Sequence, residues 1–250
     1  MTNPLKLLAL LAGLICIFSP RAMAQDSNEV EISFRVLCFE HRDNVTSVFA
    51  PANGSASTQV PLYTDDFTDV IKAKFGGGKA SFFIEEPGPG GKMQRKIVAE
   101  GTLAKSVQQA FLLVPNDVKS GGPVYRILAF EDGEETFPMG SIRAINFAQF
   151  PIRLNLAGAE MPPIKPGGVE VYPMVKKIDE WNMFTAKIQF GVSEGKWLNA
   201  ATQSWKASNG KRDWVICRYN PATKQPLIRQ YQDIPPWRKT VVPVTDGKPR

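Results

Sequence analysis

Histidine is nearly absent from this chain: His41 is the only one among 250 residues. Nucleophilic triads of the Ser-His-Asp and Cys-His types take their base from histidine, so any such site here has to use His41. A strand that continues through Cys38-Phe-Glu-His41 places Cys38 and Glu40 on one face and His41 on the other. We therefore interpret His41 as a loop residue. The cysteines and this histidine give no zinc-ligand spacing, so we predict no metal site. We also predict no catalytic residues and no cofactor.

A phosphate-binding loop is also missing. Gly76-Gly-Gly-Lys79 has Ala73 where a Walker motif needs glycine and Ala80 where it needs serine or threonine, which predicts a simple turn. Carboxylates do gather in two places, but without the spacing of a calcium loop, so we interpret both as solvated turns. A glycan hydrolase with paired carboxylates stays open, because the separation that matters to it is spatial. The two groups are Asp65, Asp66 and Asp69, and Glu131, Asp132, Glu134 and Glu135.

Long apolar runs are missing outside the N-terminus. Lys6, the apolar run Leu7–Phe18 and the small-residue site Ala22-Met-Ala24 have the pattern of a secretory signal peptide cleaved after Ala24. The run is shorter than the roughly 20 residues that a membrane-spanning helix needs, although an uncleaved anchor is the alternative. We expect a signal peptide at residues 1–24 and an exported mature chain that is periplasmic, at the cell surface or extracellular.

Cysteine is scarce as well, since only Cys38 and Cys217 follow the predicted signal peptide. In an exported chain, two distant cysteines can form one disulfide that links the two halves. The alternative is two separately buried thiols, because cysteine often serves as a small core residue. Both alternatives remain open at this point, since both cysteines lie in apolar, strand-like runs.

Glycine and proline, in contrast, are plentiful, with 20 of each. They bound short alternating or apolar segments, which is typical of all-β sandwiches and barrels. Ala110–Val114 is continuously apolar, as in a strand buried on both faces. We predict that Asp65–Lys74 is a short helix or a loop leading into a strand, and that Leu198–Ser204 is a polar loop. The predicted strands are 30–39, 44–50, 79–84, 97–103, 110–114, 124–130, 142–147, 152–156, 169–172, 184–192, 214–219 and 227–231.

The two halves of the chain resemble each other. Phe34–Phe39 and Ile142–Phe147 share an apolar-Arg-apolar-apolar-x-Phe pattern. The segment from Phe111 to Asp132 likewise parallels the segment from Trp214 to Asp233. The offset is close to the roughly 100 residues of one sandwich domain, so we predict two tandem antiparallel, immunoglobulin-like β-sandwich domains; convergent strand patterns are the alternative. Their predicted bounds are 29–137 and 138–234, followed by a proline-rich extended tail at 235–250.

The start of the second half also resembles a known family. Ile142-Arg-Ala-Ile-Asn146, Pro151-Ile-Arg-Leu-Asn-Leu156, Gly158 and Ile164-Lys-Pro-Gly167 resemble the opening of an uncharacterised family of exported bacterial domains. That family is similar to immunoglobulin-like sandwiches, and it begins with an Arg-Val-x-Asn strand, a proline-containing turn and a second strand. The resemblance implies a β-sandwich fold and a periplasmic or cell-surface setting, with no catalytic residues to carry over.

Charge and tryptophan are unevenly distributed. Residues 25–138 hold 11 basic and 16 acidic residues, whereas residues 139–250 hold 17 and 8. The halves therefore attract each other across an interface, or the basic half faces an anionic partner such as a membrane surface or an acidic glycan. Nucleic acid is disfavoured as a partner by export. All five tryptophans lie in the basic half, at positions 181, 197, 205, 214 and 237.

Two of these tryptophans have lysine neighbours and flank the predicted polar loop. Exposed tryptophans stack on sugar rings or lie at membrane interfaces, so Trp197, Trp205, Lys196 and Lys206 are our candidate ligand-binding residues. The alternative is that the tryptophans fill cores and a domain interface. The sequence as a whole predicts a non-catalytic exported protein with a structural or adhesive role at the bacterial cell envelope. A binding module for an anionic glycan or membrane surface and a glycan hydrolase are the alternatives.

Overall fold

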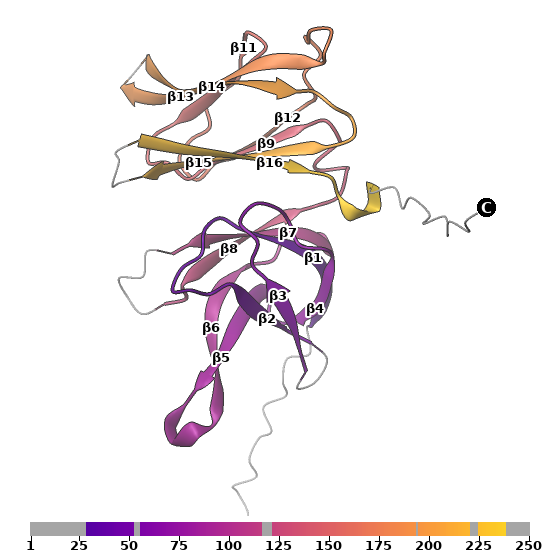
Figure 1. The fold of residues 1–250 in the computed structure, drawn as a ribbon, viewed down its shortest axis with the longest axis vertical. Helices are drawn as coiled ribbons and strands as arrows, with labels where there is room; N and C mark the ends of the chain where they lie inside the picture. The colour runs from indigo at the N-terminus through magenta and orange to yellow at the C-terminus, as the bar shows by residue number, and fades with distance from the viewer. Residues whose placement is uncertain (1–28, 53–55, 117–121, 194, 221–224, 239–250) are drawn as a thin grey trace, which may run out of the picture.

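The computed structural model describes residues 29–52, 56–116, 122–193, 195–220 and 225–238. The predicted signal peptide and most of the predicted tail lie outside the described residues, so both stay predictions. Within the described ranges the chain is all-β, with three sheets, which confirms the predicted class (Figure 1). A search of the described residues for a helix long and apolar enough to cross a membrane finds none.

Short strands connected by tight turns make up most of the described chain. The strands are β1 (Val30–Cys38), β2 (Ser47–Pro51), β3 (Ser57–Pro61), β4 (Ile71–Phe75), β5 (Lys79–Pro87), β6 (Met93–Thr102), β7 (Gln108–Pro115), β8 (Tyr125–Glu131), β9 (Ile142–Asn146), β10 (Ile152–Leu156), β11 (Ala159–Glu160), β12 (Val169–Tyr172), β13 (Met183–Ser193), β14 (Lys196–Lys206), β15 (Arg212–Asn220) and β16 (Gln225–Asp233). Two single-turn 3₁₀ helices, η2 (Pro89–Gly91) and η3 (Pro236–Arg238), complete the described elements.

The first half, residues 29–137, forms one eight-stranded sheet in the order β3-β2-β5-β6-β8-β7-β1-β4. The sheet curls around a core of aromatic side chains, in which the ring of Phe34 lies 4.8 Å from that of Phe111 and 5.7 Å from those of Phe75 and Phe82. Only two residue pairs, Ala99 with Tyr125 and Glu100 with Arg126, join β6 to β8. Without that short contact the sheet would separate into two four-stranded groups.

The second half, from residue 138 onward, has two such groups as separate sheets. Their orders are β12-β9-β15-β16 and β11-β10-β13-β14, and a core that includes Leu154, Ile188 and Trp205 lies between them. The first half has the same pairing order, with β4-β1-β7-β8 and β3-β2-β5-β6 in the corresponding places. In both halves the first strand pairs in parallel with the seventh, β1 with β7 and β9 with β15.

The strand registers also correspond between the halves. Gln109 of β7 is paired with Phe34 and Glu131, and Asp213 of β15 is paired with Ile142 and Gln232. Phe34 and Ile142 therefore occupy equivalent positions, and so do the residues that follow them, Arg35 and Arg143. Glu131 and Gln232 are equivalent in the same way, and the residues that follow them are Asp132 and Asp233. The arginines and aspartates thus occupy matching positions in the two halves.

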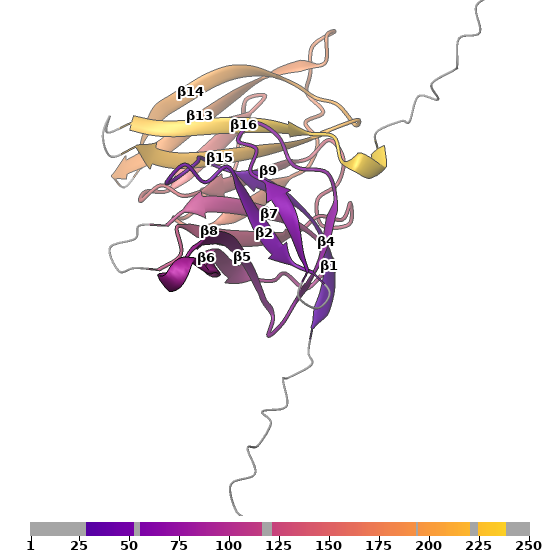
Figure 2. The ribbon, with the colours of Figure 1, turned by 60° about the horizontal axis from the view of Figure 1, so that its bottom comes forward.

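A third core, which we call the joint, packs the two halves against each other. Figure 1 shows β1, β7 and β8 of the first half stacked beneath β9, β15 and β16 of the second, and Figure 2 shows the stack from its lower end. Because the joint covers their outer face, β7 and β9 are buried on both sides, as the apolar run Ala110–Val114 predicted. The joint consists of Leu37, Phe39, Phe67, Ala110, Leu112, Val114, Phe137, Ile145, Trp214, Ile216 and Tyr231.

Two sequence predictions are wrong in detail, and one open alternative is decided. Leu198–Ser204 is the middle of strand β14 rather than a polar loop, because its backbone pairs with β13. For Asp65–Lys74 the structure has the second of the two predicted alternatives, because a loop leads into strand β4, which begins at Ile71 and pairs with β1. In the predicted extended tail, Pro236–Arg238 form a 3₁₀ turn that contacts the first half.

Candidate functional site

Four charged side chains meet at one end of the joint and are withdrawn from solvent. Arg35 Nε lies 2.9 Å from Asp132 Oδ2, and its Nη1 lies 2.8 Å from Asp233 Oδ1. Arg212 Nη2 contacts the same two aspartates, at 2.7 Å from Asp132 Oδ1. The four residues are 0–2% exposed. Each aspartate therefore holds two arginines, and each arginine bridges the two halves; we call these four residues the ionic cluster.

Electrostatics keep the ionic cluster charged. Burial alone would raise the pKa of Asp233, but hydrogen bonds and charges from Arg35 and Arg212 outweigh it and hold that pKa below its usual value. Burial likewise opposes the charge of Arg35, whereas Asp233 and Asp132 raise the pKa of Arg35 above its usual value. A buried ion pair is favourable only when its geometry is good and its hydrogen bonds are satisfied, and the contacts of the ionic cluster meet that condition.

Arg143 adds a fifth buried charge without an acidic partner at hydrogen-bonding distance. Its guanidinium lies 4.2 Å from the Phe137 ring centre and 4.7 Å from that of Trp214, and it donates two hydrogen bonds of 3.3 Å to the Glu131 carbonyl oxygen. Burial, then repulsion from Arg212, lowers the pKa of Arg143 to about 10. Arg143 is therefore still protonated at neutral pH, with aromatic rings as its main contacts.

The 3₁₀ turn η3 covers the ionic cluster from outside. Trp237 Nε1 donates to Glu134 Oε1 at 3.2 Å, and Arg238 Nε donates to the same oxygen at 2.7 Å. The Trp237 ring centre lies 5.5 Å from the guanidinium of Arg35 and 5.6 Å from that of Arg212. Glu134 thus fastens the end of the described chain to the loop that follows β8.

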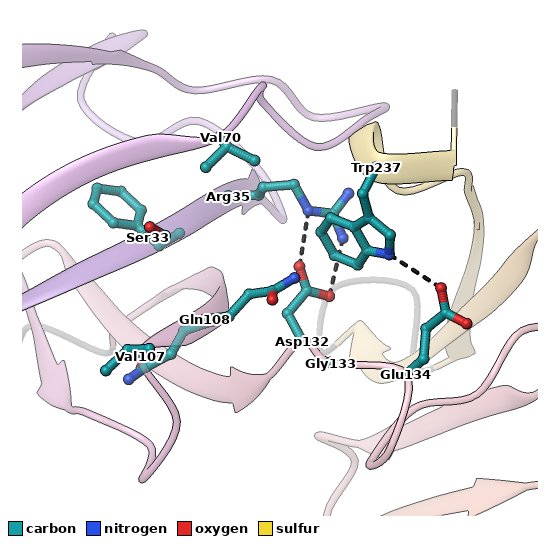
Figure 3. A pocket seen from close by; sticks show the side chains of 11 residues that line it. Ser33, Arg35, Val70, Val107, Gln108, Asp132, Gly133, Glu134 and Trp237 are labelled. Atoms are coloured by element: carbon teal, nitrogen blue, oxygen red, sulfur yellow. Dashed lines mark hydrogen bonds and ion pairs between the residues drawn. The ribbon is translucent and has the colours of Figure 1, made fainter. Parts of the chain in front are cut away.

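A cavity of about 400 Å³ opens beside Trp237, as Figure 3 shows. Its volume lies within the roughly 300–1,000 Å³ typical of small-ligand sites. Phe34, Val70, Val107 and Trp237 give it apolar walls, while Ser33 and Gln108 add polar groups. Arg35 and Asp132 reach it too, but they are engaged with each other. The arrangement suits binding rather than proton transfer, because Asp132 is already held by Arg35 and Arg212.

The predicted ligand-binding residues do not come together. Trp205 is 4% exposed, and its ring lies edge-on to Phe184 in the core of the second half. Trp197 lies eight residues earlier on β14, half-buried, with Arg153 over its ring at 4.5 Å. Eight residues of strand span roughly 27 Å, so the two tryptophans cannot share a small ligand. Lys196 and Lys206 are exposed at the opposite ends of the same strand.

The cysteines and the histidine are placed without a catalytic arrangement. Cys38 and Cys217 are both buried and unbridged, and they lie in the separate cores of the two halves. Burial raises the pKa of Cys38 to about 11 and that of Cys217 to about 12. His41 Nε2 donates to the Leu62 carbonyl oxygen at 2.6 Å. Among the described residues, no group of three or more histidine, cysteine or acidic side chains is arranged to hold a metal ion.

The structure places the two acidic clusters singled out in the sequence in different environments. Asp65, Asp66 and Asp69 are exposed in the loop before β4, as predicted. Asp132 was also assigned to a solvated turn, and that assignment is wrong, because the residue is 1% exposed inside the ionic cluster. The sequence held a usable signal, since the matched halves align Asp132 with Asp233. The sequence held no sign that Arg35, 97 residues before Asp132, would contact both Asp132 and Asp233.

The chain matches no family model, and no curated protein matches it.

Proposed function

We propose that this protein is an exported, non-catalytic two-domain protein with a structural or adhesive role at the bacterial cell envelope. Its domains, residues 29–137 and 138–234, are immunoglobulin-like β-sandwiches that arose by tandem duplication. The matching pairing order of the two halves supports the duplication. The observation that carries the proposal is the joint, because a protein that bears load or presents a surface needs its domains held in a fixed orientation.

The joint has the features of a rigid connection. Domains within one chain usually move relative to each other unless the interface between them is large and hydrophobic. Here the interface includes fully buried side chains such as Phe39, Phe137 and Trp214. The ionic cluster adds directional contacts, and a tilt of one half against the other would break the contacts of Arg35 or Arg212. We expect the two halves to move as one body.

Two measurements test this proposal. Cell fractionation of a tagged full-length chain should place the mature protein in the periplasm, the outer envelope or the medium. Small-angle scattering of the mature chain should fit the single arrangement of Figure 1 without added interdomain motion. A cytoplasmic chain of unprocessed length, or glycan hydrolysis that is lost on Asp132→Asn in a folded variant, would contradict the proposal.

A second candidate function is a binding module for an anionic glycan. The observation that favours it is the set of exposed lysines in the second half, which face solvent around an exposed tryptophan. This function is compatible with an adhesive role.

A further inference from the structure

The turn between β12 and β13 holds Trp181 out in solvent. Trp181 is 71% exposed, more than any other large hydrophobic residue in the described part of the chain. Asp179 Oδ1 accepts hydrogen bonds from the backbone N–H groups of Trp181 at 2.9 Å and Met183 at 2.7 Å. Asn182 adopts a left-handed φ of 60°, and its carbonyl accepts a 2.8 Å hydrogen bond from Ala207. The backbone that carries the indole is therefore fixed to the ends of β13 and β14.

Two hollows adjoin this turn, and the 40% exposed Ile178 lines both of them. One, of about 640 Å³, is lined by Lys177 and Lys187, and the other, of about 450 Å³, by Lys176 and Lys206. These hollows and Trp181 together form what we call the Trp181 surface. Its lysines reach solvent from three separate segments of the second half, namely the loop before the turn, β13 and β14.

The lysines of the Trp181 surface outnumber its acidic residues in the described part of the chain. None of its four lysines forms an ion pair with another described residue. Two acidic residues belong to the same turn, Asp179 and Glu180, and Asp179 Oδ1 accepts the two backbone hydrogen bonds described above. Four lysines thus stand against two carboxylates. The surface therefore keeps an excess of positive charge beside an exposed aromatic ring.

We propose that the Trp181 surface binds an acidic polysaccharide. The inference rests on the adhesive role proposed above, because it names the surface that would contact the envelope. An acidic polysaccharide presents carboxylate or sulfate groups to the lysines and the flat face of a sugar ring to the indole. Hollows on both sides of a projecting turn suit a flexible chain with spaced charges better than the flat surface of a bilayer.

Binding to defined polymers tests this inference. The probes are polygalacturonate and dextran sulfate, and the matched neutral controls are fully methyl-esterified polygalacturonate and dextran. We expect the mature protein to bind at least one acidic probe at low salt, to lose that binding as salt rises because exposed charges are screened, and to bind neither control. Binding to neither acidic probe, or equal binding to the neutral polymers, would overturn the inference.

Variants locate the surface. Trp181→Ala should weaken binding about tenfold, as truncation of a central aromatic contact does. The double variant Lys176→Gln/Lys177→Gln should weaken it by a similar factor, whereas Lys79→Gln/Lys92→Gln, an equal charge change on exposed residues of the first half, should leave it unchanged. Loss on Trp197→Ala with none on Trp181→Ala would place the site elsewhere and refute the inference.

Two further comparisons keep the proposals separate. Binding to phosphatidylglycerol vesicles with none to either acidic polymer would replace the polysaccharide with a membrane surface. Failure of polymer binding leaves the envelope location and the rigid joint to stand on fractionation and scattering. A cytoplasmic location, in contrast, would refute the proposed function even if polymer binding is found.

Discussion

Arg35 and Arg143 occupy matching positions in the two halves, yet they have opposite surroundings. Arg35 on β1 lies between the carboxylates of Asp132 and Asp233, which raise its pKa. Arg143 on β9 lies against aromatic rings, and burial lowers its pKa to about 10. Both side chains face the joint because their strand registers correspond. The same position therefore holds a well-paired cation in one half and a poorly paired one in the other.

The different surroundings of Arg35 and Arg143 are related to a third pair of matching positions. The residue before Gln109 is the neutral Gln108, while the residue before Asp213, at the matching position of the second half, is Arg212. Arg212 binds both aspartates and repels Arg143. Asp132 and Asp233 therefore share Arg35 and Arg212 at one end of the joint, and Arg143 has neither aspartate at hydrogen-bonding distance. A symmetric arrangement, with one aspartate for each arginine, is not what the structure shows.

Among the variants that test this comparison, Arg35→Met should lower the free energy of unfolding the most. Arg35→Met leaves two buried carboxylates with Arg212 as their remaining cation, and breaking a buried pair in this way typically costs about 3–5 kcal/mol. Urea denaturation of wild type and variant measures the loss. Arg42→Met is the control, because its ion pair with Glu40 is partly exposed and is worth about 1 kcal/mol or less. Equal losses in the two variants would show that the ionic cluster does not stabilise the fold.

Low pH should weaken the ion pairs that Asp233 makes in the ionic cluster. The pKa of Asp233 is lowered in the folded state, so the unfolded chain takes up this proton at a higher pH than the folded one. The stability that this carboxylate contributes is therefore complete above about pH 5 and is lost as pH falls through about 3.9 towards the folded-state value. Unfolding free energies measured from pH 6 to pH 3 should fall less steeply in Asp233→Asn than in wild type. Parallel curves would contradict the assignment.

Removal of Arg143 should cost less than removal of Arg35. Arg143→Met loses contacts with aromatic rings and two long hydrogen bonds, but it also relieves a buried charge of its repulsion from Arg212. We expect a net loss of about 1 kcal/mol, because the lost cation–π contacts and hydrogen bonds are only partly offset by the desolvation cost that the substitution removes. A loss as large as that of Arg35→Met, in the same denaturation experiment, would mean that the two positions are equivalent after all.

The last comparison of the two halves concerns the reactivity of their buried cysteines, for which we expect the smallest effect. Cys38 and Cys217 lie in different cores, and burial raises the pKa of each to about 11 and 12, respectively. At pH 8 neither Cys38 nor Cys217 of the folded protein should therefore react with a thiol-specific dye or a disulfide-exchange reagent, because the thiolate is the reactive form. Both thiols should react once denaturant is added. Rapid labelling of the folded protein would show that one core opens readily.

Local pattern predicted the strands whose side chains carry a clear signal. The apolar run Ala110–Val114 and the alternation through Ile152–Leu156 both correspond to observed strands. Strand β14 was missed because it is an edge strand with mostly exposed side chains, and a register shift opposite Ile188 and Gln189 interrupts its alternation. Its backbone hydrogen bonds to β13, which no side-chain pattern reveals, make it a strand.

The sequence by itself determined the all-β class, the similarity of the two halves and the uneven charge between them, because each depends on neighbours in the chain or on composition. Tertiary structure decided the partners of Asp132, which lie 97 and 80 residues away, and the separate burial of the two cysteines. It also decided which tryptophan of the described residues is the most exposed: Trp181 rather than Trp205. These outcomes depend on how finished strands pack, and a side chain's surroundings are fixed only when distant strands meet.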